Sequence, residues 1–306
     1  MSCPRNNDIN RIAAIDVGSN SIKMLAAEVT PAGISYLKWH SVTVRLQSGL
    51  LADGSLDEAA LERAEGAICT LADMARTLGA ERIEAFGTSA LRDAANSGEL
   101  IRRVREKAGV RLRVISGEEE AESAYSAAAP SGRAMVVNPG GGSTEMIIGE
   151  NGRPVAAVSA HIGAVSLMKE AAGRSACETE QLARAHLEPQ WLKLGVPAPE
   201  TVIASGGAAA CAADVMIALP KHDPNAVEGF VMTRKAAGEL LEKLFPMSVE
   251  ERCRMPGMNP QRADILPYGL AILTAFMDLS GAPALTISDR GNLYGFIERM
   301  LREEQA

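Results

Sequence analysis

One short pattern occurs twice in this chain of 306 residues, and it constrains the fold more than any other feature. Each copy consists of an apolar segment, a tight turn of small polar residues and a second apolar segment. The first copy has its turn at residues 18–20 and the second at residues 140–142. Apolar segments on either side of a glycine turn are typical of antiparallel strands. The repetition therefore predicts two similar lobes with a cleft between them.

The two copies align residue by residue. Asp16 matches Asn138, and Gly18 and Ser21 of the first copy match glycine and serine of the second. Glycine lets main-chain N–H groups approach an anion closely, and nearby hydroxyl groups add further donors. One such turn would indicate an ordinary hairpin, but a matched pair favours a phosphate site. The predicted phosphate-binding residues of the two turns are Gly18, Ser19, Asn20, Ser21, Gly140, Gly141, Gly142, Ser143 and Thr144.

Carboxylates accompany both turns. Asp16 precedes the first turn and Glu145 follows the second. Hard oxygen ligands of this kind hold magnesium, which neutralises phosphate charge. We therefore predict that Asp16, Asn138 and Glu145 bind Mg²⁺ or another divalent cation, with Asn138 offering only an uncharged carbonyl oxygen.

The composition is typical of a globular protein. Hydrophobic residues make up 47% of the chain, enough for a sizeable core in two domains. The net charge of −7 does not provide the basic face that nucleic acids require. No apolar run approaches the roughly 20 residues that span a bilayer, and the first ten residues are polar. We therefore expect a cytoplasmic protein that binds neither nucleic acid nor membrane. Its Ala- and Met-rich closing third suits a homodimer interface as well as a core.

The apolar periodicity predicts alternating strands and helices, and hence an α/β fold. The expected strands are 11–15, 22–29, 34–37, 42–46, 83–86, 111–115, 134–137, 144–148, 155–159, 201–204 and 284–288. The expected helices begin near residues 55, 96, 117, 207 and 293. Ser55 and Glu58 have the spacing of a capping box at the start of the first helix.

Four phrases give the sequence a resemblance to a known family. They are AIDVGSNS at 14–21, GTSALRDAAN at 87–96, ISGEEEA at 115–121 and GGGSTE at 140–145. In this order they resemble the exopolyphosphatase and guanosine pentaphosphate phosphohydrolase family. Weaker matches at 205–207 and 262–264 extend the resemblance over nearly the whole chain.

The resemblance implies a two-lobed actin-like ATPase fold, related to ribonuclease H, in which β-rich phosphate-binding lobes are duplicated around a cleft. The length fits the short two-domain members of the family. We accordingly expect lobe I at residues 1–128 and lobe II at residues 129–289. The closing helix, near 290–306, is expected to pack back on lobe I.

The resemblance also implies which residues act in hydrolysis of a terminal phosphoanhydride. Glu120, immediately before Ala121, matches the catalytic glutamate of the family and would be the base for an in-line attacking water. Arg92, expected in a loop after strand 83–86, would clasp phosphate oxygens, and Lys23 would add a second cation where the family commonly has Arg. The close competitors of Glu120 are Glu118, Glu119 and Glu122.

Two departures from the family pattern bear on activity. The family has Asp where this chain has Asn138, and its Leu-Arg-Glu-Gly ending is missing from the phrase at 288–295. We predict an exopolyphosphatase-like hydrolase that uses a divalent cation to release orthophosphate from polyphosphate or guanosine pentaphosphate. Asn138 favours one alternative, a degenerate sensor that binds polyphosphate or a nucleotide. A small-molecule kinase of the same fold is the other alternative, and the Glu120 phrase counts against it.

Overall fold

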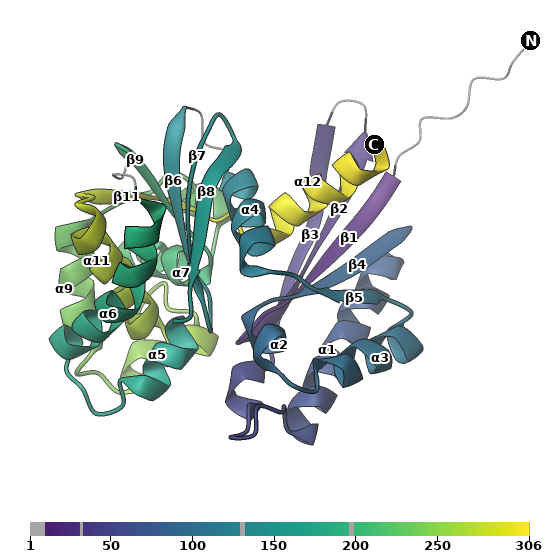
Figure 1. Ribbon diagram of the computed structural model, residues 1–306, viewed down its shortest axis with the longest axis horizontal. Coiled ribbons are helices and arrows are strands. Elements are labelled where there is room, and N and C mark those ends of the chain that lie inside the picture. Colours follow the sequence, from purple (N-terminus) through teal and green to yellow (C-terminus); the bar gives the residue numbers. More distant parts are fainter. Residues whose placement is uncertain (1–9, 31–32, 129–131, 196–198, 306) are drawn as a thin grey trace, which may run out of the picture. The chain divides into compact units, whose positions relative to one another are not determined.

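The computed structural model describes residues 10–30, 33–128, 132–195 and 199–305. Their contacts divide them into two compact units, each with its own sheet (Figure 1). The first unit comprises the described residues up to Ile115 together with those from Phe296 onward. The second unit is Ser116–Gly295.

The first unit is built on a five-stranded sheet. Its opening strands β1, β2 and β3 form an antiparallel meander, after which β4 pairs parallel with β1 and β5 pairs parallel with β4. The spatial order is therefore β3-β2-β1-β4-β5. The strands are β1 (Asn10–Val17), β2 (Ser21–Thr30), β3 (Gly33–Thr43), β4 (Arg82–Gly87) and β5 (Arg111–Val114). The connections contain η1 (Leu46–Gly49), α1 (Glu58–Thr77), α2 (Ser89–Asp93) and α3 (Ser97–Ala108).

Apolar residues cover both faces of the central strand β1. Ile12 and Ile15, which point to opposite faces, are both fully buried. On one face Ile15 belongs to a core that includes the apolar side of α1. In the same unit, the part of α12 (Asn292–Gln305) from Phe296 onward packs against the sheet, where Phe296 stacks on Phe86 with ring centroids 4.1 Å apart. A strand buried on both faces explains the unbroken apolar run at the start of the chain.

The second unit repeats this topology. β6, β7 and β8 form an antiparallel meander, β9 pairs parallel with β6, and β11 pairs parallel with β9. The short strand β10 adds an antiparallel edge, giving the order β10-β11-β9-β6-β7-β8. The strands are β6 (Arg133–Pro139), β7 (Thr144–Glu150), β8 (Arg153–Ala160), β9 (Thr201–Ser205), β10 (Val231–Thr233) and β11 (Ala284–Ser288). Strands β6 to β9 and β11 thus correspond in order and direction to β1 to β5, which confirms the predicted duplication.

Helices complete the second unit. α4 (Gly117–Ala128) packs on one face of the sheet, on β7 and β8, and most of the remaining helices contribute to the core on the opposite face. They are α5 (Ala164–Glu170), α6 (Ala176–Leu194), α7 (Gly207–Met216), α8 (Pro224–Val227), α9 (Arg234–Leu244), α10 (Val249–Cys253), η2 (Pro260–Arg262) and α11 (Leu266–Ser280).

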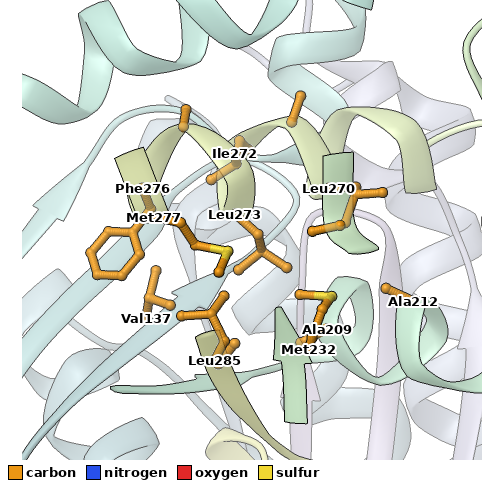
Figure 2. Packing of buried hydrophobic residues seen from close by; sticks show 14 of the residues in the cluster. Val137, Ala209, Ala212, Met232, Leu270, Ile272, Leu273, Phe276, Met277 and Leu285 are labelled. Carbon is orange, nitrogen blue, oxygen red and sulfur yellow. The ribbon is translucent and has the colours of Figure 1, made fainter. Parts of the chain in front are cut away.

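The most apolar stretch of the closing third, α11, is a core helix. Figure 2 shows Leu273 and Met277 of α11 above Val137 of β6 and Leu285 of β11, and all four side chains are buried. Among the described residues, no helix has the length and apolar character needed to cross a membrane.

Three local predictions were wrong. The strands expected at 34–37 and 42–46 are the single strand β3, which includes the intervening residues 38–41 and ends at Thr43. The capping box of Ser55 does not form, because Asp57 caps α1 by accepting from the Ala60 N–H at 2.6 Å. The third error is the omission of β10, whose three residues are too few to produce a periodic pattern.

The predicted lobe boundaries remain a prediction. In the described structure α4 groups with the second sheet, whereas the prediction placed residues up to 128 in the first lobe. The residues of α12 up to Gly295 group with the second unit and those from Phe296 with the first.

Candidate active site

The first turn joins β1 to β2. The Gly18 N–H donates to the Ser21 carbonyl at 3.2 Å, and a Cβ atom on Gly18 would lie only 2.9 Å from that oxygen. The carbonyl groups of Ser19 and Asn20 accept N–H groups from the segment 44–47, at 2.8–3.0 Å. Because these carbonyls are engaged within the protein, the turn offers its N–H groups and hydroxyls to a ligand.

The second turn has the same construction. The Gly140 N–H donates to the Ser143 carbonyl at 2.7 Å. The carbonyls of Gly140 and Gly141 accept N–H groups of residues 164–166, at the start of α5. A Cβ atom on Gly163 would overlap the backbone of Gly141, so the start of α5 can approach the turn only if residue 163 is glycine. In each unit, therefore, the segment after the third strand holds the turn from its carbonyl side.

The residues that flank the turns differ in charge. Asp16 lies directly opposite Lys23 across the strands, and Lys23 Nζ is 3.9 Å from Asp16 Oδ2. At the equivalent positions of the second unit, Asn138 lies opposite Glu145. The first pair is thus a carboxylate and a cation, and the second is an amide and a carboxylate.

Asp16 has the properties of a cation ligand. It is 5% exposed, and Oδ1 has no hydrogen-bond partner within the described part of the chain. Burial raises the pKa of the Asp16 carboxyl group, and the charge of Lys23 opposes this effect. A buried carboxylate oxygen without a donor is suited to a hard divalent cation.

Glu145 is fully buried and accepts a hydrogen bond from Ser159 Oγ at 3.0 Å. A Cβ atom on Gly117 would lie 3.0 Å from the Cβ atom of Ser159, so the start of α4 lies against the Ser159 side chain. The carboxyl group of Glu145 is therefore fixed from β8, next to the helix that carries Glu120.

Burial distinguishes Glu120 from its neighbours. Glu120 is 4% exposed, whereas Glu118 and Glu122 are exposed. Glu119 caps its own helix, because its carboxylate accepts from the Ser116 N–H at 2.9 Å while its N–H donates to Ser116 Oγ. Only Glu120, among these four glutamates, combines burial with a position outside the helix cap.

Glu120 and Asn138 are connected through Asn292. Asn138 Nδ2 donates to Asn292 Oδ1 at 3.1 Å, and Asn292 Nδ2 donates to Glu120 Oε1 at 3.4 Å. Residues from three elements, α4, β6 and α12, therefore meet beside the second turn.

Arg92 lies in the short helix α2 and not in the loop that was predicted. Its Nη1 donates to the Ile115 carbonyl at 3.1 Å, which fixes the guanidinium group at the end of β5. The same helix begins with Ser89, which is 2% exposed and whose hydroxyl has no hydrogen-bond partner among the described residues. The Thr88 N–H donates to the Val17 carbonyl at 3.3 Å, so α2 starts beside the first turn.

The predicted site residues thus gather in two half-sites, one in each unit. We define the first half-site as Asp16, Gly18, Ser19, Asn20, Ser21, Lys23 and Arg92, and the second as Glu120, Asn138, Gly140, Gly141, Gly142, Ser143, Thr144 and Glu145. No group of three or more His, Cys, Asp or Glu side chains within the described ranges is arranged to hold a metal ion. The predicted ligands Asp16 and Glu145 belong to different units.

Comparison with known proteins identifies the family. The model of the Ppx/GppA phosphatase family matches residues 25–304. The chain belongs to this family. Exopolyphosphatase 2 of Mycobacterium tuberculosis is 30% identical over 318 residues, covering 94% of this chain and 97% of that protein. The guanosine-5'-triphosphate,3'-diphosphate pyrophosphatase of Vibrio cholerae is 29% identical over 95% of this chain, which spans only 59% of that longer protein.

Solved structures agree with this assignment. The Ppx/GppA family member of Aquifex aeolicus is 26% identical, has a TM-score of 0.83 and covers 97% of this chain, which in turn covers 99% of it. An exopolyphosphatase from Cytophaga hutchinsonii, 21% identical with a TM-score of 0.86, shares the fold; the match covers 96% of this chain and 98% of that one. The predicted family, the two-sheet α/β fold and the enzyme class, a hydrolase of phosphoric anhydrides, are confirmed. Enzymes of the Ppx/GppA family generally depend on a divalent cation.

Sequence reasoning missed three polar residues of these half-sites: Ser89, Ser159 and Asn292. Ser89 lies within a phrase that carried the family resemblance, so that phrase was an available signal. Asn292 lies in the phrase that departs from the family ending, which marked the position as unusual but gave no hint of its partners. Nothing in the local pattern marks Ser159, which faces Glu145 because of strand register.

Proposed function

We propose that this protein is an exopolyphosphatase that releases terminal orthophosphate from inorganic polyphosphate, with guanosine pentaphosphate as a second substrate. The observation that carries the proposal is the burial of Glu120 in a hydrogen-bonded chain with Asn138, the residue that leads into the second glycine turn. A buried carboxylate next to a group of phosphate-binding N–H donors is the combination that hydrolysis of a phosphoanhydride requires.

In this mechanism Glu120 orients a water molecule in line with the terminal phosphorus atom. The water oxygen forms a bond to phosphorus while the bond from phosphorus to the bridging oxygen breaks. The Glu120 carboxylate accepts the water proton, and the products are orthophosphate and a chain that is one phosphate shorter.

The two turns would hold the phosphate oxygens. The N–H groups of the turns and the hydroxyls of Ser19, Ser21 and Ser143 would supply donors, while Lys23 and Arg92 would supply positive charge. The Thr144 hydroxyl does not serve as such a donor, because it is buried and donates to the Ile162 carbonyl at 2.6 Å. These interactions stabilise the charge that the transferring phosphoryl group carries in the transition state.

We propose Mg²⁺ as the cation, with Asp16, Asn138 and Glu145 as the residues that would hold it. When bound, the ion would neutralise charge on the phosphate oxygens. Asp16 fits this role because one of its buried oxygens has no donor among the described residues.

Orthophosphate release from short and long polyphosphate, with and without Mg²⁺, tests the proposal. We expect Glu120→Gln to lower kcat by about 100-fold or more, since a general base contributes roughly 10²–10⁴-fold. The matched control is Glu122→Gln, which removes an exposed carboxylate from the same helix and should leave kcat unchanged.

Full activity of the Glu120→Gln variant would contradict the assignment of the base. If the folded wild-type protein bound polyphosphate tightly and released no phosphate under any condition, the hydrolase proposal would be wrong and a sensor would be favoured. Release from guanosine pentaphosphate alone would reject polyphosphate as the substrate.

A further inference from the structure

Asn292 occupies an unusual position at the start of α12. Its amide nitrogen donates to Glu120 Oε1 at 3.4 Å, and its amide oxygen accepts from Asn138 Nδ2 at 3.1 Å. Because an amide has a donor at one end and an acceptor at the other, Asn138 fixes which end of Asn292 faces the carboxylate. The bond to Asn138 therefore directs the Asn292 donor toward Glu120.

Asn138 is held from the opposite side. Gly206, at a φ of +89°, passes so close that a Cβ atom there would overlap Asn138 Oδ1. The amide of Asn138 is thus confined between this backbone and Asn292.

The loop before Asn292 is also fixed. The Asp289 N–H donates to the Glu228 carboxylate at 2.9 Å, and Ser288 Oγ donates to the same carboxylate at 3.1 Å. The Asp289 carboxylate pairs with His222 Nε2 at 3.3 Å. These bonds determine where α12 begins and therefore where the Asn292 side chain lies.

Both asparagines stand at departures from the family pattern. The resemblance to the family implies Asp at the position of Asn138, and Asn292 lies in the phrase 288–295, which departs from the family's Leu-Arg-Glu-Gly ending. The two departures contact each other in the structure. Asp at position 138 would attract the Asn292 amide nitrogen away from Glu120, whereas Leu at position 292 would leave the Asn138 amide without this acceptor.

We propose that Asn292 is a positioning residue for the Glu120 carboxylate, and that Asn138 and Asn292 act as one unit in this chain. The inference rests on the proposed function for its kinetic consequence. In this arrangement the Asn292 amide donor holds one carboxylate oxygen of Glu120.

Replacing Asn292 with Leu tests the role of the donor. We expect kcat to fall by about tenfold, the scale of one hydrogen bond to a charged group, while KM changes less than twofold because Asn292 does not touch substrate. Asn225→Ala, an exposed asparagine of the same unit, is the control and should leave both constants unchanged. A tenfold rise in KM with an unchanged kcat in Asn292→Leu would overturn the proposal.

A double-mutant cycle tests the coupling of the two asparagines. We expect Asn138→Asp and Asn292→Leu each to reduce kcat, and the double variant to be at least tenfold more active than the product of the single effects predicts. Multiplicative effects within a factor of two would show that the residues act independently.

An NMR measurement separates this inference from the proposed function. The side-chain NH₂ resonances of Asn292, assigned through the Asn292→Leu variant, should shift in the Glu120→Gln protein and in Asn138→Leu, but not in Glu122→Gln. If the Asn292 resonances shift as expected but the protein hydrolyses no phosphoanhydride, the contact between Asn292 and Glu120 is supported and only the proposed function is rejected. Resonances insensitive to Glu120→Gln would reject the positioning role even in an active enzyme.

Discussion

The two glycine turns have the same backbone and different chemistry. Each is closed by a bond from its first glycine to the residue three positions later, and each has its carbonyls engaged by the segment after the third strand. The flanking pairs differ, because Asp16 faces Lys23 in the first unit and Asn138 faces Glu145 in the second. The two units therefore share the backbone of the turn, whereas the side chains that face each other across the strands differ in charge.

Under the proposed function, this difference gives the two units different chemical roles. The first half-site combines a buried carboxylate with Lys23 and Arg92, so it is suited to binding a cation and phosphate oxygens. The second contains Glu145 and, on a helix packed against the same sheet, the buried Glu120. We therefore assign the base to the second unit alone.

The largest effect should follow from deforming the second turn alone. Gly163→Ala would force a methyl group into the Gly141 backbone and push the start of α5 away. We expect a loss of about 2–3 kcal/mol in stability, typical of overpacking, and a fall in kcat of about 100-fold, since displacements near 1 Å can have this effect. Thermal unfolding and orthophosphate release measure the two effects.

The control for this variant is Gly98→Ala, because a Cβ atom there meets open space in a helix. It should be neutral or stabilising by up to about 1 kcal/mol. Unchanged activity in a well-folded Gly163→Ala protein would break the claim that the second turn must keep its geometry.

Substitutions that exchange Asp and Asn at positions 16 and 138 test the difference in charge between the two turns. Asp16→Asn removes the charge from the first half-site, and we expect the Mg²⁺ concentration for half-maximal activity to rise about tenfold or more, because a unit charge at 4 Å contributes roughly 1–4 kcal/mol at effective dielectric constants of 80 to 20. Magnesium titrations of activity measure this change. The opposite exchange, Asn138→Asp, should lower the required Mg²⁺ concentration, and equal requirements in all three proteins would contradict the assigned ligands.

The smallest effect concerns the support of the second half-site. His222 bonds Asp214 at 2.9 Å and Asp289 at 3.3 Å, and these hydrogen bonds raise the pKa of His222 from 6.5 to about 10. Since the folded-state pKa is raised, the stabilisation is fully present below pH 6.5 and is lost as the pH rises through about 10. The ring is more than one third exposed, so solvent screening limits the effect to about 1 kcal/mol.

Urea unfolding of the wild-type protein and of His222→Gln at pH 6 and above pH 10 measures this contribution. We expect the variant to be less stable at pH 6 and the difference to shrink above pH 10. A difference of the same size at both pH values would show that the charge of His222 does not contribute.

The sequence predicts the turns well because their geometry depends on local residues. Glycine at positions 18 and 140 is favoured by close contacts with the carbonyl oxygen three residues later, and the strand register then places Asp16 opposite Lys23 without long-range information. The placement of Glu120 in the first turn of a helix was predictable for the same reason.

The contacts of Asn292 were not predictable from local pattern. Its partners Asn138 and Glu120 are 154 and 172 positions away in the chain, so only the tertiary fold brings them together. Arg92 was assigned to a loop because α2 has only five residues, too few to show helical periodicity.

A crystal structure of the Glu120→Gln protein with Mg²⁺ and tripolyphosphate tests the proposed role of Glu120 beside the second turn, since this variant should bind the substrate without turnover. We predict that the terminal phosphate accepts hydrogen bonds from N–H groups of residues 141–143 and lies next to residue 120. A phosphate chain that is remote from the second turn would contradict the proposal.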